Sequence, residues 1–281
     1  MTTEKNLAIV DREAHDSSTY YVFDDGETHN PPTDLIFDDG EPLESYRHRT
    51  GMNVLIRSLQ QLWCDRNDYF TGGNMFIYYS STQVRNRDFR GPDFFAVLNI
   101  DGTNTRQGWV VWDENGRYPD VIVELMSPST AAIDKGIKKD LYEQTFRTSD
   151  YFVYDPFNPR SLQGWHLDDN QKYQPLIPNE HGWLWSRRLG LWLGTWEGTV
   201  ERETTIWARF YDVAGNLVLL PEEAAKSQAE AAKSQAEAAK SQAEAAKSQA
   251  EAAKSREEEA KAKADRLAAR LRELGEDPDM L

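Results

Sequence analysis

The last sixty residues of this chain can form little other than one long helix. The seven residues Ala-Ala-Lys-Ser-Gln-Ala-Glu recur without interruption from Ala224 to Glu251. Alanine, lysine, glutamine and glutamate are all good helix formers. Every Trp, Tyr and Phe of the chain lies before Pro221, so the repeat has no large side chains from which to build a core. The chain therefore divides into an aromatic-rich part that can fold around a core and a helical tail.

One side of the tail helix carries small apolar residues at alternating spacings of four and three. This seam consists of Ala225, Ala229, Ala232, Ala236, Ala239, Ala243, Ala246, Ala250, Ala253, Glu257, Ala260, Ala264, Leu267, Leu271 and Leu274. A sustained seven-residue period is typical of a left-handed coiled coil, so we expect a homodimer through this helix. Alanine buries little area, so the leucines must supply most of the contact. A lone, solvated helix that acts as a spacer is the alternative.

Composition predicts three parts and a reducing environment. Residues 1–40 are a polar lead-in rich in Asp, Thr and Pro, residues 41–221 are long enough for one globular domain, and residues 222–281 are the tail. The single cysteine, Cys64, excludes an internal disulfide and fits the cytosol. The first residues show no signal-peptide pattern, and no stretch approaches the roughly 18 apolar residues of a membrane span. We expect a cytoplasmic protein with no membrane partner.

The charge of the chain excludes one class of nucleic-acid protein. The net charge is −15, and residues 222–281 carry 11 Lys and Arg against 14 Asp and Glu, which leaves −12 for the rest. Such an acidic domain has no general attraction for nucleic acid, which argues against a non-specific DNA-coating protein. A metal-dependent nuclease is less affected, because its carboxylates bind cations first. The basic residues 85, 87, 90, 135, 138 and 139 could form a positive rim or simply be scattered, solvated charges.

Apolar periodicity predicts an α+β domain around a mixed sheet. Helical spacing covers residues 45–67 and 133–148, strand patterns cover 76–79, 94–98, 121–126 and 151–155, and further hairpins are expected from 165 to 220, including a strand at 218–220. Helices and strands that alternate in this way favour a sheet flanked by helices.

Two acidic residues stand in apolar strands, where a carboxylate is expensive to bury. Glu124 lies within the run Val-Ile-Val-Glu-Leu-Met at residues 121–126, and Asp93 opens the apolar run at residues 94–98. Burying a carboxylate requires a positive partner. Two acids on two strands could share a divalent metal, whereas a structural ion pair between Glu124 and an arginine is the alternative. Asp120, four residues before Glu124, could approach the same metal or open the strand in solvent.

Four ordered blocks of the sequence resemble one known family. They are Arg90-Gly91-Pro92-Asp93, the run Val-Glu-Leu-Met-Ser-Pro-Ser-Thr at 123–130, residues 134–142 and Tyr-Phe-Val-Tyr-Asp at 151–155. Together they resemble the Uma2 family of restriction-type endonucleases, which is abundant in cyanobacteria and lies within the PD-(D/E)XK nuclease superfamily. The resemblance covers about residues 41–196. It implies a restriction-endonuclease-like mixed β-sheet core flanked by helices, and metal-dependent hydrolysis of phosphodiester bonds, with DNA as the substrate.

The resemblance also implies a metal site. Asp93 matches the first acid of the superfamily motif and Glu124 the second. With the backbone carbonyl of Leu125, they would hold Mg²⁺, for which Mn²⁺ is a possible substitute. The chain departs from the superfamily pattern at Met126, which stands where a lysine is usual.

In the Uma2 pattern, a lysine on the next helix takes that role. The motif Asp-x-x-x-Lys-x-x-x-Tyr is matched here by Asp134, Lys138 and Tyr142. Spacings of four place these residues on one face of a helix, so Lys138 is the expected third catalytic residue. Lys139 is the neighbouring candidate, but it points about 100° away.

Two residues before the core motifs could support the site. Family members often carry a histidine where His48 stands, and Glu44 lies four residues before it. An acid from this helix joins the metal site of some superfamily members.

A different class of function also fits the chain, namely a catalytically inactive nuclease fold that serves as an interaction module with a coiled-coil arm. The displaced lysine, the acidity and the long tail all agree with that alternative.

Overall fold

A computed structural model describes residues 35, 37, 45–80 and 90–273 of the chain. Its contacts divide the chain into two compact units, residues 1–220 and 221–281, and each unit is described by itself. Except for Leu35 and Phe37, the expected lead-in at residues 1–40 lies outside the described residues, as do Arg85, Arg87 and the tail beyond Glu273.

The core of the first unit is a six-stranded mixed sheet, as predicted. Its strands run in the order β1 (Tyr69–Gly72), β3 (Phe94–Leu98), β5 (Val121–Leu125), β6 (Asp150–Asp155), β7 (Asn158–Leu167) and β8 (Tyr173–Pro175). The pair β5 and β6 is parallel, whereas every other neighbouring pair is antiparallel. A parallel pair needs a crossover connection, and residues 131–146 supply it as a helical segment.

The first helix, α1 (Tyr46–Leu62), forms because its apolar residues recur at helical spacing and its start is capped. The hydroxyl of Ser45 accepts a hydrogen bond from the backbone N–H of His48 at 3.4 Å, which satisfies one of the free donors of the first turn. Leu55 and Leu59 are fully buried. The predicted helix at 45–67 is therefore confirmed, although it ends five residues earlier.

The crossover is helical but not the single α-helix that the periodicity predicts. It consists of α3 (Ala131–Ile133), the π-helix η1 (Asp134–Lys138), α4 (Lys139–Leu141) and the π-helix η2 (Tyr142–Phe146). A π turn closes an i→i+5 hydrogen bond and is frequent at functional sites. The segment ends at Arg147, whose φ of 53° lies in the left-handed region.

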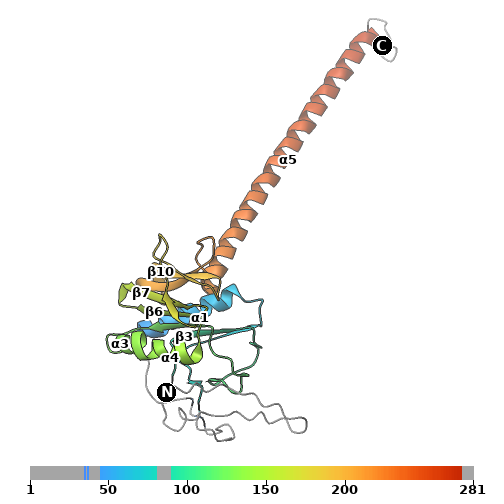
Figure 1. Cartoon of the computed structure of the whole chain (residues 1–281). Coiled ribbons are helices and arrows are strands. Elements are labelled where there is room, and N and C mark those ends of the chain that lie inside the picture. Colours follow the sequence, from blue (N-terminus) through green and yellow to red (C-terminus); the bar gives the residue numbers. More distant parts are fainter. Residues whose placement is uncertain (1–34, 36, 38–44, 81–89, 274–281) are drawn as a thin grey trace, which may run out of the picture. The chain divides into compact units, whose positions relative to one another are not determined.

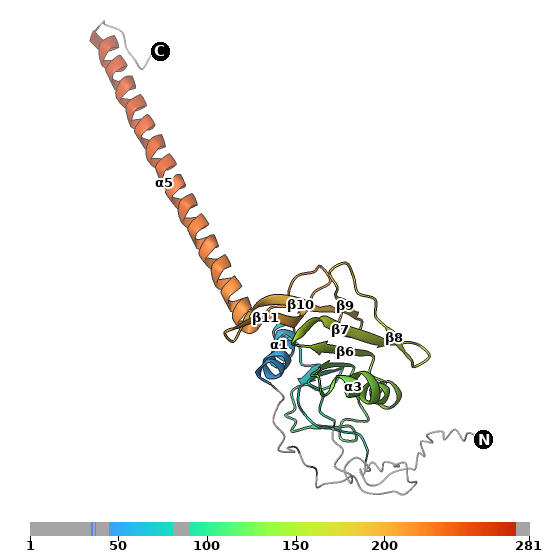
Figure 2. The ribbon, with the colours of Figure 1, turned by 90° about the vertical axis from the view of Figure 1, so that its left-hand side faces the viewer.

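The alternation of residues along β5 divides the core into two layers. One layer contains Val121, Val123 and Leu125 with Leu55 and Leu59 of α1. The other contains Ile122 and Met126 with Tyr142, Phe146 and Tyr151. The ribbon shows the same division, with α3 and β10 on opposite sides of β6 and β7 (Figures 1 and 2). Glu124, which alternates with Ile122, therefore faces the crossover helices, as the strand pattern predicts.

Two smaller sheets complete the unit. Strands β9 (Leu184–Ser186), β10 (Leu191–Val200) and β11 (Glu203–Tyr211) form an antiparallel sheet, while β2 (Ile77–Tyr78) pairs in parallel with β4 (Trp109–Val110). The inner face of the antiparallel sheet packs on the first core layer through Leu193, Ala208 and Phe210. The hairpins expected after residue 165 are present, but the predicted strand at 218–220 is wrong. That stretch is irregular chain, in which Val218 and Leu220 are buried.

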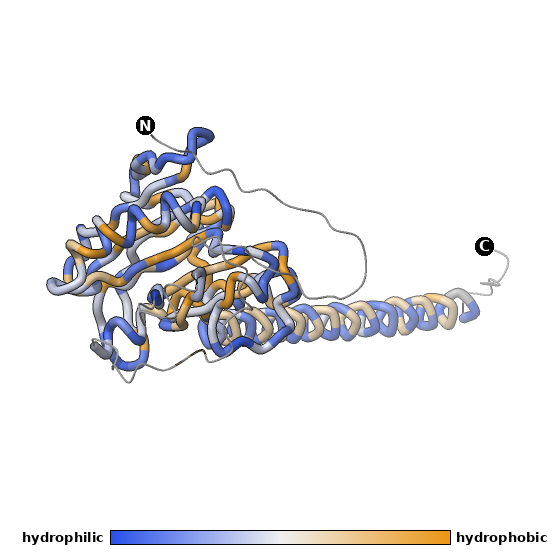
Figure 3. Tube along the Cα trace, turned by 60° about the horizontal axis from the view of Figure 1, so that its bottom comes forward, coloured by the Kyte–Doolittle hydropathy of each residue, from blue (hydrophilic) through white to orange (hydrophobic). Residues whose placement is uncertain are grey.

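The second unit is the helix α5 (Pro221–Glu273), 53 residues long. Strongly hydrophobic residues are frequent in the first unit, whereas α5 alternates hydrophilic and weakly hydrophobic residues along its length (Figure 3). Leu267 in the predicted seam is 57% exposed. The predicted long helix is confirmed, and the coiled coil stays a prediction. Within the described ranges, no helix is both long enough and apolar enough to cross a membrane.

Candidate active site

The pairing of β3 with β5 brings the two acids of the sequence motif together. Asp93 directly precedes β3 and Glu124 is the fourth residue of β5, and the register pairs Phe94 with Val123. The backbone N–H of Asp93 donates to Oε2 of Glu124 at 3.4 Å. The backbone N–H of Leu125 donates to Oδ2 of Asp93 at 2.7 Å. Each acid is thus held by the backbone of the other strand.

The turn after β1 fixes the backbone that carries Asp93. The N–H of Asn74 donates to the carbonyl oxygen of Pro92 at 2.9 Å. Beside it, a Cβ atom built on Gly73 would lie only 2.3 Å from the carbonyl oxygen of Asp93. A side chain at this position would push the turn away, so the close approach requires glycine.

The crossover helix brings three further residues of the motif to Glu124. The ammonium nitrogen of Lys138 lies 3.2 Å from Oε1 of Glu124 and 2.8 Å from Oδ1 of Asp134. The hydroxyl of Tyr142 donates to the same Oε1 at 2.8 Å. Despite the π turns, the four-residue spacing brings all three side chains to one place. Lys139 instead lies over the ring of Trp165, 5.3 Å from its centroid.

Burial raises the pKa of both acids. Burial, followed by the charge of Glu124, raises the pKa of Asp93 well above its ordinary value. Glu124 is 1% exposed, and burial raises its pKa despite the opposing effect of Lys138. Holding both carboxylates ionised therefore costs the fold free energy unless more positive charge arrives.

The two side chains that bond to Glu124 keep their protons at neutral pH. Burial lowers the pKa of Lys138, but Glu124 and Asp134 outweigh it, so the pKa lies above its ordinary value. Burial, and then the charge of Glu124, raises the pKa of Tyr142 well above its ordinary value. Lys138 is a fixed positive charge, and Tyr142 is a neutral hydrogen-bond donor.

Comparison with known proteins places the chain in a family. Residues 22–201, which include every described residue of this cluster, match the Uma2 family, described as "Putative restriction endonuclease". The chain belongs to the Uma2 family. The family resemblance inferred from the four sequence blocks is thereby confirmed, and with it a restriction-endonuclease-like fold.

The other two comparisons provide no further evidence of function. No curated protein matches this Uma2 chain. A crystal structure of a "putative nuclease belonging to DUF820" from Anabaena variabilis ATCC 29413 is similar at 12% sequence identity with a TM-score of 0.34. That similarity covers 53% of this chain and 84% of the Anabaena chain.

The donor set of the Uma2 site fits the divalent ion that the family implies. Asp93 and Glu124 offer hard carboxylate oxygens and carry more negative charge than Lys138 balances, because Asp134 shares the same ammonium group. Mg²⁺ usually binds through one or two carboxylates and keeps several waters. In the part of the chain that the structure describes, no group of three or more His, Cys, Asp or Glu is arranged as a metal cage.

The remaining candidates lie apart from this pair or cannot be placed. His48 is buried on α1, with Nδ1 2.7 Å from Oγ of Ser45 and Nε2 3.3 Å from the carbonyl oxygen of Met126. It therefore ties α1 to the end of β5. At Leu125 the backbone N–H donates to Asp93, and the role of its carbonyl as a metal ligand stays a prediction. Glu44 lies outside the described residues.

Asp120 overturns both expectations for it. It is only 9% exposed, so it does not open β5 in solvent, and its carboxylate bonds to the end of β3 that lies away from Asp93. Oδ2 accepts a hydrogen bond from the N–H of Leu98 at 2.8 Å, and Oδ1 accepts one from the guanidinium of Arg188. The alternative of an arginine partner for Glu124 is not what the structure shows, because the ion-pair partner among the described residues is Lys138.

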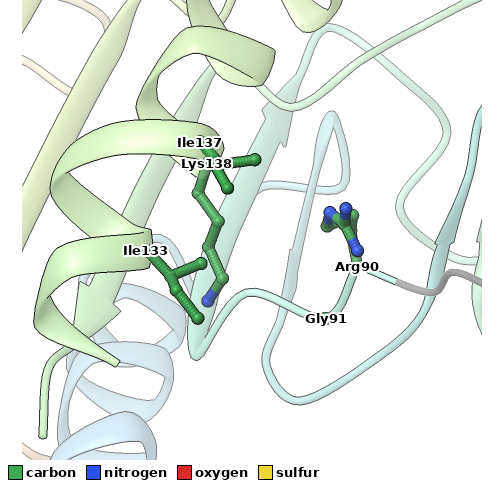
Figure 4. Close-up of a pocket in the computed structure, with 5 residues that line it drawn as sticks. All are labelled: Arg90, Gly91, Ile133, Ile137 and Lys138. Carbon is green, nitrogen blue, oxygen red and sulfur yellow. The ribbon is translucent and has the colours of Figure 1, made fainter. Parts of the chain in front are cut away.

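A pocket opens beside the carboxylates, and its apolar residues were not predicted. It is lined by Arg90, Gly91, Ile133, Ile137 and Lys138. Figure 4 shows Arg90 across the pocket from Lys138 and the two isoleucines. The sequence signal that could have revealed this wall is the pair of isoleucines four residues apart next to a motif lysine.

Proposed function

We propose that this Uma2 protein is a metal-dependent endonuclease that hydrolyses phosphodiester bonds in DNA. The observation that carries the proposal is the pair of adjacent acids, Asp93 and Glu124, whose pKa values are both raised, with one charged lysine beside an open pocket. Perturbed titratable groups that converge next to a pocket are characteristic of catalytic centres. The family description agrees with nuclease chemistry.

Asp93 and Glu124 would hold Mg²⁺, or Mn²⁺ in its place, together with the carbonyl of Leu125. When bound, the ion supplies Lewis-acid chemistry at the phosphate. The protein's contribution is to fix its ligands in advance. The N–H of Leu125 orients Asp93, and the hydroxyl of Tyr142 orients Glu124. Residues around metal ligands commonly set ligand orientation in this way.

Lys138 acts through its charge. Its raised pKa keeps the amine protonated, so it cannot accept a proton from water at neutral pH. It can donate hydrogen bonds to the oxygens of a phosphate, on which negative charge redistributes in the transition state. Asp134 and Glu124 hold the ammonium group at the edge of the pocket, where a phosphate would enter.

The experiment that tests this proposal is the cleavage of supercoiled plasmid by the purified protein in Mg²⁺, Mn²⁺ or EDTA. We expect nicking that requires the metal and disappears in Glu124→Ala. Asp140→Ala is a matched control, since Asp140 is an exposed acid on the same crossover helix, and this variant should cleave like the wild type.

Two results would contradict the proposal. One is equal nicking in EDTA and in Mg²⁺, and the other is equal nicking by the wild type and Glu124→Ala. A folded wild type that cleaves neither plasmid nor single-stranded or branched DNA would favour the alternative of an inactive interaction module.

We also propose that α5 joins two copies of the chain. Support comes from the seam of alanine and leucine at heptad spacing and from Leu267, a large hydrophobic residue of that seam that is 57% exposed. Sedimentation of the full chain beside a chain that ends at Pro221 tests this. A dimer for the first and a monomer for the second are expected, whereas two monomers would exclude it. Two nuclease sites in one dimer could cut both strands, by analogy with other nucleases.

A further inference from the structure

The pocket beside Lys138 combines positive charge with an exposed apolar wall. Ile133 is 46% exposed and Ile137 is 67% exposed, although both are large hydrophobic residues. They stand four residues apart on the crossover helix, and Arg90 lies across the pocket from them (Figure 4). The pocket has a volume of about 400 Å³, within the size range of sites for small organic ligands.

This combination fits a ligand with two chemically different halves. Arg90 and Lys138 can hold an anion, and a planar guanidinium suits the oxygens of a phosphate. The isoleucines cannot stabilise a bare phosphate, which is strongly hydrated. Contact between the isoleucines and an apolar ligand surface removes both from water and so favours binding. A phosphate that carries a sugar and a base satisfies both halves of the pocket.

We infer that the pocket binds one unstacked nucleotide, with its phosphate between Arg90 and Lys138 and its sugar and base against Ile133 and Ile137. The inference rests on the proposed nuclease function, because it names the substrate of the same centre. Ile133 and Ile137 are then binding residues for the nucleotide next to the cleaved bond.

An unstacked nucleotide narrows the class of substrate. In a regular duplex the bases are stacked inside, and a protein reaches the face of a base only after unpairing it or on a single strand. The charge of the domain points the same way, since residues 1–221 carry a net −12. Such a net charge gives the domain no general attraction for the closely spaced phosphates of a long duplex. Single strands, flaps or locally opened duplexes are the substrates that the pocket favours.

Binding of a mononucleotide tests the pocket without any cleavage. Isothermal titration in Mg²⁺ would compare deoxyadenosine 5′-monophosphate with inorganic phosphate on the full-length protein. We expect the wild type to bind the nucleotide about tenfold more tightly than phosphate, because covering an exposed isoleucine is worth about that factor. Ile137→Ser should reduce the advantage to about threefold or less and leave phosphate binding unchanged.

Two further variants complete the test. Arg90→Ala should weaken binding of both the nucleotide and phosphate. Ile177→Ser is the matched control, since Ile177 is 88% exposed and does not line the pocket, and it should bind both ligands like the wild type. Equal affinity for nucleotide and phosphate in the wild type would overturn the inference. An unchanged ratio in Ile137→Ser, or an equal loss in Ile177→Ser, would do the same.

The binding result and the cleavage result are separable. If nucleotide binding depends on Ile137 but the protein leaves DNA intact, the inferred nucleotide pocket stands and the proposed nuclease function is excluded. If the protein nicks DNA in a metal-dependent way but its nucleotide binding does not depend on Ile137, the proposed nuclease function stands and the inferred nucleotide pocket is excluded.

Discussion

The two ends of β5 each carry buried acids, and they treat those acids differently. At the start of the strand, Asp150 of the neighbouring β6 is fully buried beside Val121. Its Oδ1 lies 2.7 Å from Nδ1 of His166, and its Oδ2 accepts hydrogen bonds from the hydroxyl of Ser186 at 2.7 Å and the N–H of Arg188 at 3.0 Å. With Asp120, Asp150 forms what we call the donor-rich end.

At the other end of β5 the positively charged donors are too few, although Tyr142 and two backbone N–H groups also donate. Asp93 and Glu124 face one another, and the single ammonium of Lys138 is shared between Glu124 and Asp134. We call Asp93 and Glu124 the donor-poor end. Because burying a carboxylate is tolerable only when donors match it, this contrast supports the proposal that the acids at this end receive a positive charge from outside the chain.

The largest expected difference between the two ends is in cleavage. Asp93→Ala should lower the initial rate of plasmid nicking by about 10³-fold or more, because it removes a ligand of the catalytic ion. The same substitution at Asp150, assayed well below its melting temperature, should leave the rate within about threefold. Asp93→Asn keeps an acceptor for the N–H of Leu125 and should still be inactive. Equal nicking rates for folded Asp93→Ala and Asp150→Ala would contradict the proposed functional difference between the two ends of β5.

The second difference is in stability, where the substitution of Asp150 rather than of Asp93 should have the larger effect. Asp150→Ala should lower the free energy of unfolding by about 3 kcal/mol, because buried donors on Ser186 and Arg188 lose their acceptor. Asp93→Ala should change it by less than about 1 kcal/mol, since the lost hydrogen bond is offset by relief of repulsion with Glu124. Urea unfolding without metal measures both. Asp169→Ala, at an exposed acid, is the control, and a larger loss in Asp93→Ala than in Asp150→Ala would contradict the prediction.

The third difference is the response to metal. Mg²⁺ at 100 times its dissociation constant should raise the free energy of unfolding by about 2.7 kcal/mol if it binds only the folded protein. The gain should vanish in Asp93→Ala and persist in Asp150→Ala, although the latter starts from a lower stability. Thermal melts at increasing Mg²⁺, with K⁺ as the ionic-strength control, provide the measurement. An equal gain in both variants would place the ion elsewhere.

The sequence alone predicts the donor-poor end well, for a local reason. Alternation along β5 sets the face of Glu124, and four-residue spacing sets the common face of Asp134, Lys138 and Tyr142. Both are consequences of backbone geometry within one element. The family pattern adds which acid on the neighbouring strand belongs with them. The pairing of β3 with β5 then brings Asp93 to Glu124.

The donor-rich end was not predicted, because its partners are remote in sequence. Asp120 pairs with Arg188 across 68 positions, and Ser186 reaches Asp150 across 36. Nothing in the composition around Asp120 distinguishes a buried ion pair from a solvated turn. The π turns of the crossover were not predicted, for a different reason. The residue spacing of the crossover is equally compatible with a regular α-helix, so it carries no signal for a π turn.

The smallest expected difference is the dependence of stability on pH without metal. Burial raises the pKa of Asp93 and of Glu124, so between the ordinary value near 4 and the raised value the folded protein binds more protons than the unfolded chain. Their contribution to stability is present at low pH and is lost as pH rises through the raised pKa. One extra bound proton changes the free energy of unfolding by at most about 1.4 kcal/mol per pH unit. Other acids also titrate, so the informative quantity is the difference between the wild type and Asp93→Asn in EDTA. That difference should grow in favour of Asp93→Asn as pH rises from about 4. A constant difference across the range would show that Asp93 is ionised in the folded protein without cost, and the shortage of donors at its end of β5 would then have no energetic consequence.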